Sequence, residues 1–428
     1  MMNNSNCLKG CFVIPSYILT NIVDHPSAPE SAKVHARNAL VFTRDCHQRR
    51  DELIAQRLNA SQAEVQGIIP GHILANIVSS EVANTHARNA AQNSLVISGV
   101  IRDQREAQAA SLRPKAAAPK RLNRMIYSAD NTDIPDNTLL RSEGGPATSD
   151  PAAEECYDGF GSTFKFYADV FDRNSINDGG MTLTGTIHFK NAYSNAQWDG
   201  AQMIFGDGDG TYFNRFTTSL DVIGHELTHG VTQYTANLIY RGLPGALNES
   251  MSDVFGVMVK QYQLGQTSAQ ADWLIGAELW TPNVKGIALR SMKAPGTAYD
   301  DPVLGKDRQT ASYAEVLSTA YPDSFDHGGV HIYSGVPNRA FYLIAIQLGG
   351  HSWDRAGRIW WAVLSGGQLQ PDADFHDFAK LTCEAAQSLY GSSVKTVVET
   401  AWREVGVEVG GQPDSVPQPK QEPSTTPS

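Results

Sequence analysis

The sequence is short of cysteine and has no long apolar run. Its five cysteines are an odd number, and three of them lie in the first fifty residues, so a disulfide framework is not expected. No stretch reaches eighteen apolar residues, which excludes a membrane-spanning helix. Residues 1–6 contain no basic side chain, and Pro15 interrupts the apolar run 11–19. The chain therefore does not start with a conventional signal peptide.

Positive charge is also in deficit. The formal net charge is −11, and only 18% of the residues are charged. Such a balance argues against a nucleic acid or an anionic membrane as partner. A length of 428 residues leaves room for two or three domains with an ample core.

The first 112 residues contain a duplicated unit. Residues 12–23 match residues 68–78, and the string His-Ala-Arg-Asn-Ala recurs at 35–39 and 86–90. Two copies cannot form a solenoid, so we interpret the unit as a short module that is repeated once. Each copy is predicted to be an apolar, proline-containing segment followed by a helix.

Composition then changes along the chain. Residues 113–121 are basic and rich in Pro and Ala, which predicts an exposed linker and a natural place for proteolysis within 113–124. Residues 125–230 carry short alternating strands such as 184–189. Residues 231–410 show helical patterns at 247–262, 310–320, 334–348, 354–364 and 373–390. Residues 411–428 have the composition of a disordered tail.

The motif that carries most chemistry is His225-Glu226-Leu227-Thr228-His229. On a helix, His225 and His229 lie on one face and can bind one ion, with Glu226 placed to take a proton from an activated water. Twenty residues later, Glu249 offers a third ligand, and Asp253 can accept the spare ring N–H of a ligating histidine. A chance match on a surface helix is the alternative. It is disfavoured by the proline-free helical context before the motif.

A β-rich half joined to a helical half by this helix predicts an α+β fold with the metal in the cleft between the halves. Further strings then carry a resemblance, namely 195–200, 205–210, 221–232, 248–253, 289–292 and 328–335. In this order they resemble the thermolysin-like metallopeptidases. The segment Ile-Pro-Ser-Tyr-Ile-Leu at 14–19 resembles the protealysin-type subgroup. The resemblance implies a two-domain catalytic unit, 125–230 and 231–410, preceded by a small propeptide.

The resemblance also implies a zinc endopeptidase that cuts on the N-terminal side of hydrophobic residues by a zinc-activated water. One zinc would be held by His225, His229 and Glu249, with Glu226 as general base. His331 would stabilise the oxyanion with Tyr240, and Asp326 would orient its ring. Without the resemblance, His331 is better interpreted as a structural histidine. The substrate residues would be Asn195, Ala196 and Arg290, although a lone arginine more often forms a surface ion pair. An apolar pocket would be formed by Phe213, Phe216, Val222, Ile275, Leu279 and Leu289, residue types that in most proteins are plain core.

Residues 1–112 are expected to act as an inhibitory propeptide, with an extended segment around 15–19, or its copy at 70–74, at the substrate edge near Asn195. A folding aid without inhibitory action is the alternative, and a Cys11 thiolate on the zinc is a further hypothesis. We expect a monomer that acts on peptides or proteins. It is either secreted by a non-classical route or held in the cytoplasm as a zymogen.

Calcium binding is doubtful, because Lys260, Ala277 and Ile287 stand where calcium-rich members carry ligands. The remaining acids are Asp221, Asp272 and Glu278, and Lys260 is expected to pair with Asp221 or Asp272. Two other classes of function remain open: a catalytically silent binding protein with this fold, and a zinc hydrolase acting on non-peptide substrates.

Overall fold

The computed structural model describes residues 11–12, 14–41, 120–132, 134, 136–191, 193–302, 304–322 and 326–410. All of them belong to one of the two compact units into which the chain divides. The second copy of the duplicated unit, residues 113–119 of the linker and the tail 411–428 lie outside the described residues.

A six-stranded mixed sheet forms the first layer, in the order β1-β5-β6-β4-β2-β3. The central strands β2, β4 and β6 run parallel, and β3, β5 and β1 are added antiparallel. Strand β4 contains residues 184–187 of the strand predicted at 184–189, and the last two residues lie beyond its end. The strands are β1 (Cys11–Phe12), β2 (Arg124–Ser128), β3 (Thr138–Ser142), β4 (Leu183–Ile187), β5 (Ala196–Trp198) and β6 (Met203–Phe205).

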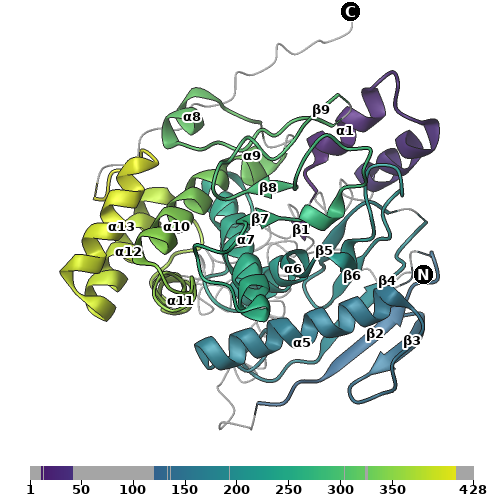
Figure 1. Ribbon diagram of the computed structural model, residues 1–428, viewed down its shortest axis with the longest axis horizontal. Coiled ribbons are helices and arrows are strands. Elements are labelled where there is room, and N and C mark those ends of the chain that lie inside the picture. Colours follow the sequence, from purple (N-terminus) through teal and green to yellow (C-terminus); the bar gives the residue numbers. More distant parts are fainter. Residues whose placement is uncertain are drawn as a thin grey trace, which may run out of the picture. The chain divides into compact units, whose positions relative to one another are not determined.

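A long helix, α5 (Pro151–Phe171), covers this sheet, and the sequence patterns did not predict it in the β-rich half. Asp150 caps it by accepting a hydrogen bond from the amide of Ala152 at 2.9 Å, and Pro151 suits the first turn. The helix packs tightly against β4, because a Cβ at Gly185 would lie 2.8 Å from both Cys156 Sγ and Phe160 Cζ. Figure 1 shows α5 running along β2 and β3.

The second half is helical, as predicted, with two helices that the patterns did not predict, at 326–333 and 392–404. A stacked pair, Trp360 and Trp402, with ring centroids 6.1 Å apart, lies in its core. The helices are α6 (Leu220–Gln233), α7 (Gly242–Leu264), α8 (Tyr313–Ser318), α9 (Asp326–Tyr333), α10 (Gly335–Leu348), α11 (Ala356–Ser365), α12 (Phe375–Tyr390) and α13 (Ser392–Glu404). Two short antiparallel pairs are also present. Strand β7 (Leu274–Ile275) pairs with β8 (Arg290–Ser291), and β9 (Asp300–Asp301) pairs with β10 (Gly305–Lys306). Single 3-10 turns are η1 (Phe216–Thr218) and η2 (Ala277–Leu279).

Helices α6 and α7 approach each other through two glycines. A Cβ at Gly256 would lie 2.4 Å from the carbonyl oxygen of Asp221, and one at Gly224 would lie 3.1 Å from the Cα of Gly256. No larger side chain fits between backbones at this separation. The close crossing brings the face of α6 that carries His225 and His229 against α7.

Residues 11–12 and 14–41, the described part of the N-terminal segment, pack on the β-rich and helical halves, which are called the catalytic halves below. After β1, residues Ser16–Asp24 form α1, and residues 30–41 are helical. The prediction of an extended segment around 15–19 was therefore wrong from Ser16 onward. Pro15 has the φ of −59° and ψ of 139° of a residue that precedes a helix, and the apolar side chains at 18, 19 and 22 are fully buried. Among the described residues before α1, those of β1 form a strand and Pro15 has extended dihedrals.

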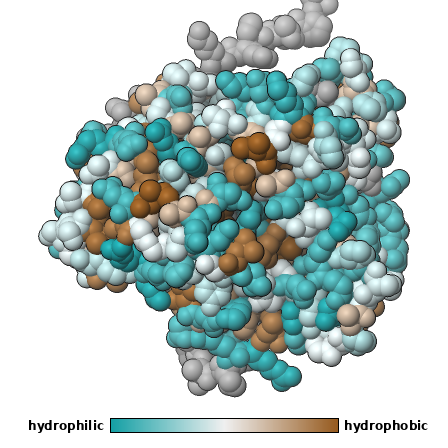
Figure 2. All heavy atoms as spheres, viewed as in Figure 1, coloured by the Kyte–Doolittle hydropathy of each residue, from teal (hydrophilic) through white to brown (hydrophobic). Residues whose placement is uncertain are grey.

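Among the described residues, no helix is long and apolar enough to cross a membrane. On the face shown in Figure 2, apolar areas are interspersed with hydrophilic ones.

A histidine between two carboxylates ties the sheet to the start of α5. His188 Nε2 lies 2.7 Å from Asp150 Oδ2, and Nδ1 lies 2.8 Å from Asp207 Oδ2. The hydrogen bond that the ring donates to Asp207, helped by the one to Asp150 and opposed by desolvation, raises the pKa of His188 to about 9. The protonated ring is thus favoured in the folded state.

This cluster predicts a pH-dependent stability. Because the folded pKa is above the ordinary value of about 6.5, the contribution is complete below pH 6.5 and is lost as the pH rises through about 9. His188→Asn suits the positive φ of 52° at this position. It should lower the free energy of unfolding at pH 6 by about 1–2 kcal/mol after allowing for solvent screening, and by much less at pH 10. Urea unfolding curves of the parent and the variant at pH 6 and pH 10 measure this difference in the free energy of unfolding. An equal loss at both pH values would contradict it.

Candidate active site

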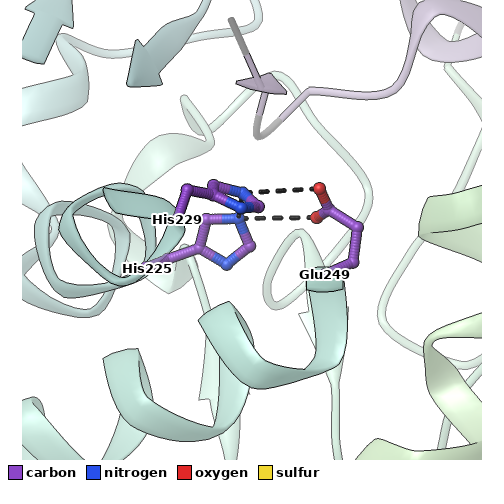
Figure 3. Close-up of side chains that lie close together, drawn as sticks. All are labelled: His225, His229 and Glu249. Carbon is purple, nitrogen blue, oxygen red and sulfur yellow. Dashed lines mark hydrogen bonds and ion pairs between the residues drawn. The ribbon is translucent and has the colours of Figure 1, made fainter. Parts of the chain in front are cut away.

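Three predicted ligands converge between α6 and α7. The Nε2 atoms of His225 and His229 lie 3.1 Å apart. Glu249 faces both, with Oε2 3.5 Å from His225 Nε2 and Oε1 3.4 Å from His229 Nε2. Figure 3 shows the two rings leaving α6 and pointing toward the carboxylate on α7. All three side chains are buried, and their ligand atoms lie within 4.8 Å of one another.

The opposite nitrogen of each ring is held by a neighbour on α7. His225 Nδ1 lies 2.8 Å from Asp253 Oδ1. His229 Nδ1 lies 2.9 Å from Asn248 Oδ1 and 3.0 Å from Ser252 Oγ. Sequence reasoning named Asp253 but missed Asn248 and Ser252, although both flank Glu249 on the same helix. With Nδ1 donating its proton, each Nε2 presents a lone pair to the space between the rings and Glu249.

This arrangement fits a cation. Two lone pairs facing each other at 3.1 Å cannot form a hydrogen bond, and Glu249 Oε2 has no hydrogen-bond partner in the described part of the chain. Two ligands on a tetrahedral ion with bonds of 2.0–2.1 Å lie roughly 3.3 Å apart, close to the three separations observed. Two imidazoles and one carboxylate are also the donors of catalytic zinc sites.

Glu226 lies beside this cluster without being part of it. Its Oε2 accepts a hydrogen bond from the amide of Trp198 in β5 at 2.9 Å. Its Oε1 is buried and has no hydrogen-bond partner among the residues that the structure describes. Burial, which removes water from the charged form, raises the pKa of this carboxyl to about 8.

His331 and Tyr240 approach the cluster from the other side. His331 Nε2 lies 3.3 Å from Glu249 Oε2 and 3.3 Å from the hydroxyl of Tyr240, which also donates to Glu249 Oε1. Asp326 fixes the His331 ring through Nδ1 at 2.5 Å and accepts the His331 amide at 3.0 Å. Positive φ values at 326–329 produce the tight turn that directs His331 inward.

Arg290 holds Asp253 in this structure. Its Nε and Nη2 donate to the two Asp253 oxygens at 2.9 and 2.7 Å, and Asn338 Nδ2 donates to Oδ2 at 2.8 Å. The carboxylate that orients His225 is thereby itself fixed by two side chains. Asn338 was not predicted, because no sequence pattern links it to a residue 85 positions away. A role of Arg290 in substrate binding stays a prediction.

The predicted substrate residues fall into two groups. Asn195 and Ala196 lie at the edge strand β5, where Asn195 Oδ1 accepts the amide of Ile14 at 3.0 Å. In the predicted pocket, Phe213 stacks on Phe216 with centroids 6.0 Å apart, and a Cβ at Gly276 would touch both Leu279 and Leu289. The backbone of Leu289 bonds that of Ile275 at 3.0 Å, and Val222 projects from α6. All six side chains are buried.

Comparisons with known proteins agree with this geometry. Residues 120–233 match the family model described as "Thermolysin metallopeptidase, catalytic domain", and residues 236–407 match "Thermolysin metallopeptidase, alpha-helical domain". An extracellular metalloprotease of Pectobacterium carotovorum is 52% identical over 67% of this chain and 82% of its own length. Protease PrtS of a Photorhabdus strain is 44% identical over 80% of this chain and 92% of its own.

A solved structure is similar over most of both chains. The precursor of protealysin, a metalloproteinase from Serratia proteamaculans, has a TM-score of 0.66 and 45% identity, covering 79% of this chain and 99% of its own. The β-rich and helical halves, and the resemblance read from the sequence, are thereby confirmed. This chain belongs to the thermolysin family of metallopeptidases, hydrolases that cleave peptide bonds, and is of the protealysin type.

Proposed function

We propose that this chain is a zinc-dependent endopeptidase that is made as a zymogen. The observation that carries the proposal is the convergence of His225, His229 and Glu249, with Glu226 on one side and His331 on the other. The first three would hold the zinc. When bound, zinc supplies a Lewis acid that polarises a carbonyl and lowers the pKa of water.

The surrounding side chains supply proton transfer and charge stabilisation. Glu226 takes a proton from the attacking water and passes it to the leaving amine. His331 Nε2 and the Tyr240 hydroxyl donate hydrogen bonds to the oxyanion of the tetrahedral intermediate. Asp326 keeps the His331 ring oriented, so that little reorganisation is needed during the reaction.

The side chain after the scissile bond is proposed to enter the apolar pocket defined by the six residues named above. Such a pocket favours Leu, Ile, Val or Phe, with roughly 1–3 kcal/mol of discrimination for each methylene-scale difference. Their burial in the present structure supports an apolar surrounding at this place.

A peptide assay with metal exchange tests the function. The processed protein should hydrolyse casein and a furylacryloyl dipeptide, lose the activity at least about a hundredfold on zinc removal, and regain it when zinc alone is restored. A zinc hydrolase for non-peptide substrates would cleave esters and leave both peptides intact. A silent binding protein would hold zinc without hydrolysing either class.

The N-terminal segment is proposed to inhibit. Its strand β1 adds to the edge strand β5, with Cys11 opposite Trp198 and Phe12 opposite Gln197, which is how an extended peptide binds a sheet edge. Ile14 exchanges hydrogen bonds with the Asn195 side chain at 3.0 and 3.4 Å. The similar chain from Serratia proteamaculans is itself a precursor. The side chain of Cys11 lies outside what the structure describes, so its contact with zinc stays a hypothesis.

We propose that residues 1–112 are the propeptide and that maturation cleaves within 113–124. Arg124 is already the first residue of β2, and its guanidinium bonds both oxygens of Glu143 at 2.6 and 2.7 Å. Cleavage on the N-terminal side of Arg124 leaves strands β2 to β6 intact. Since a similar protein is named extracellular, we propose that the mature enzyme acts outside the cell.

Lys260 is proposed to replace calcium. Its ammonium nitrogen lies 3.1 Å from Asp221 Oδ2, 3.2 Å from Asp272 Oδ2 and 3.8 Å from Glu278 Oε1, and the residue is 9% exposed. Burial alone would lower the pKa of Lys260, but the three carboxylates, Asp221 foremost, raise it. A fixed cation on α7 thus occupies the centre of the acidic cluster, where Ca²⁺ would need six to eight oxygens.

Calcium should therefore have little effect on stability. The melting temperature of zinc-loaded protein is expected to change by less than about 2 °C when millimolar Ca²⁺ is removed and restored, because weak binding adds little free energy. Lys260→Glu should be destabilised without Ca²⁺ and regain several degrees with it. A large calcium response in the parent that Lys260→Glu does not alter would show that calcium binds elsewhere.

A further inference from the structure

The catalytic halves hold the first copy of the duplicated unit through a small docking surface, formed by Asn195, Tyr299, Leu304, Gly305 and Arg308. Asn195 binds the backbone of Ile14. The Tyr17 hydroxyl lies 3.4 Å from that of Tyr299, and Arg308 lies over the Tyr17 ring at 5.2 Å. The side-chain amide of Asn21 donates to the carbonyl of Leu304. Figure 1 shows α1 beside β9, in agreement with this bond.

The second copy retains most of these residues. Residues 14–23 and 69–78 are identical at seven of ten positions, and the three differences fall at 16, 17 and 20. Of these, 20 is exposed and 16 is partly exposed in the first copy. Only Tyr17, replaced by His72, is a buried contact residue. The side chains at 14, 18, 19 and 22, all 0% exposed, recur unchanged.

Shared apolar residues alone would also be expected if both copies merely pack against their own helices. Asn21 distinguishes the two explanations. Its side-chain amide donates a hydrogen bond to the carbonyl of Leu304 in the catalytic halves. A Cβ at position 305 would lie 2.6 Å from Asn21 Nδ2, so Gly305 leaves room for this amide. In a helix without this contact, Ala would be more stable than Asn at this position, because Ala has the higher helix propensity. The second copy nevertheless keeps it, as Asn76.

We propose that the docking surface accepts either copy, so that residues 69–78 take the place of residues 14–23 once the first copy is displaced or removed. The inference rests on the proposed zymogen and deepens it. Cleavage between the copies, within 42–67, then leaves the site covered. Activity is released only by the second cut, within 113–124.

Tethering makes a weak second copy sufficient. From the end of the second His-Ala-Arg-Asn-Ala string to Lys120 there are 29 residues (119 − 90), which reach at most roughly 95 Å when extended. A tether of this kind gives effective concentrations near the millimolar range. A segment that binds at about 0.1 mM would then occupy the surface roughly ten to one. Loss of the Tyr17–Tyr299 contact in the second copy explains why the first copy is the one bound in the intact chain.

Photo-crosslinking in the full chain tests the inference. A Glu226→Gln protein, which cannot cut itself, carries p-benzoylphenylalanine in place of the exposed Lys306, next to Gly305 in β10. The parent should crosslink to peptides from 14–41. In Ile14→Asp/Ile18→Asp, the ratio of products from 68–90 to those from 14–41 should rise at least about tenfold. Adding Ile69→Asp/Ile73→Asp should remove both products.

The matched control is Thr20→Asp, which puts an aspartate on the exposed face of α1 and should leave the parent pattern unchanged. One zinc per chain in each variant shows that the catalytic halves are folded, and Asn21→Asp with Asn76→Asp provides a second pair. If the Ile14→Asp/Ile18→Asp variant binds one zinc per chain but gives no product from 68–90, this inference is wrong, while the proposed zymogen is unaffected. A parent without products from 14–41 would overturn the inhibitory docking itself.

Discussion

Glu226→Gln is expected to lower kcat/KM for peptide hydrolysis by about 10²–10⁴ while zinc remains bound. The substitution keeps the size of the side chain, and a glutamine oxygen can still accept the Trp198 amide. What is lost is the ability to take a proton from the attacking water, which is worth two to four powers of ten. The three residues proposed to hold zinc are untouched, because in the described part of the chain Glu226 Oε2 accepts the Trp198 amide and Oε1 forms no hydrogen bond.

The measurement combines initial rates on a furylacryloyl dipeptide with zinc content by elemental analysis. His225→Ala is the control. It should lose both the metal and the activity, and it should leave the Asp253 carboxylate without one of its partners. Robust turnover by Glu226→Gln would refute the role of Glu226 as general base, and loss of zinc in that variant would show that Glu226 belongs to the metal site.

The intact chain is expected to be latent, and processing should raise its activity at least about a hundredfold. Strand β1 covers the edge of β5 and Ile14 occupies both hydrogen-bonding groups of Asn195, so a substrate cannot pair there. Full-length Glu226→Gln, which cannot process itself, should be cut within 113–124 by a small amount of added active enzyme. Intact mass and N-terminal sequencing of the products identify the bond.

Asn195→Ala in the same inert background serves as the control for docking, since it removes the partner of Ile14 while the linker is unchanged. It should be cut at the same place and at least as fast. If uncleaved wild type, verified by mass in the assay itself, is as active as the chain starting at residue 113, the propeptide is a folding aid and not an inhibitor.

The sequence alone determined the parts of this protein that depend on local spacing. Two histidines four residues apart on a helix share a face, whatever the rest of the fold does. In the structure their Nε2 atoms lie 3.1 Å apart, with the rings oriented by partners on α7. The helical repeat patterns of the second half were likewise readable. The family resemblance added Lys260 as a partner of Asp221 or Asp272, and in the structure it contacts both. Binary patterning failed for α5, a helix that Asp150 caps in the structure.

The tertiary structure decided those contacts between distant residues that neither a motif nor the family resemblance indicated. Nothing in the sequence joins Asn338 to Asp253, Asn248 to His229 as a hydrogen-bond partner, or Asn21 to Leu304, because loop closure and packing, not periodicity, select such pairs. The same holds for α1. Its residues were expected to be extended at the substrate edge, but burial of the apolar face at 18, 19 and 22 favours a helix, and only the residues before it reach β5 as a strand.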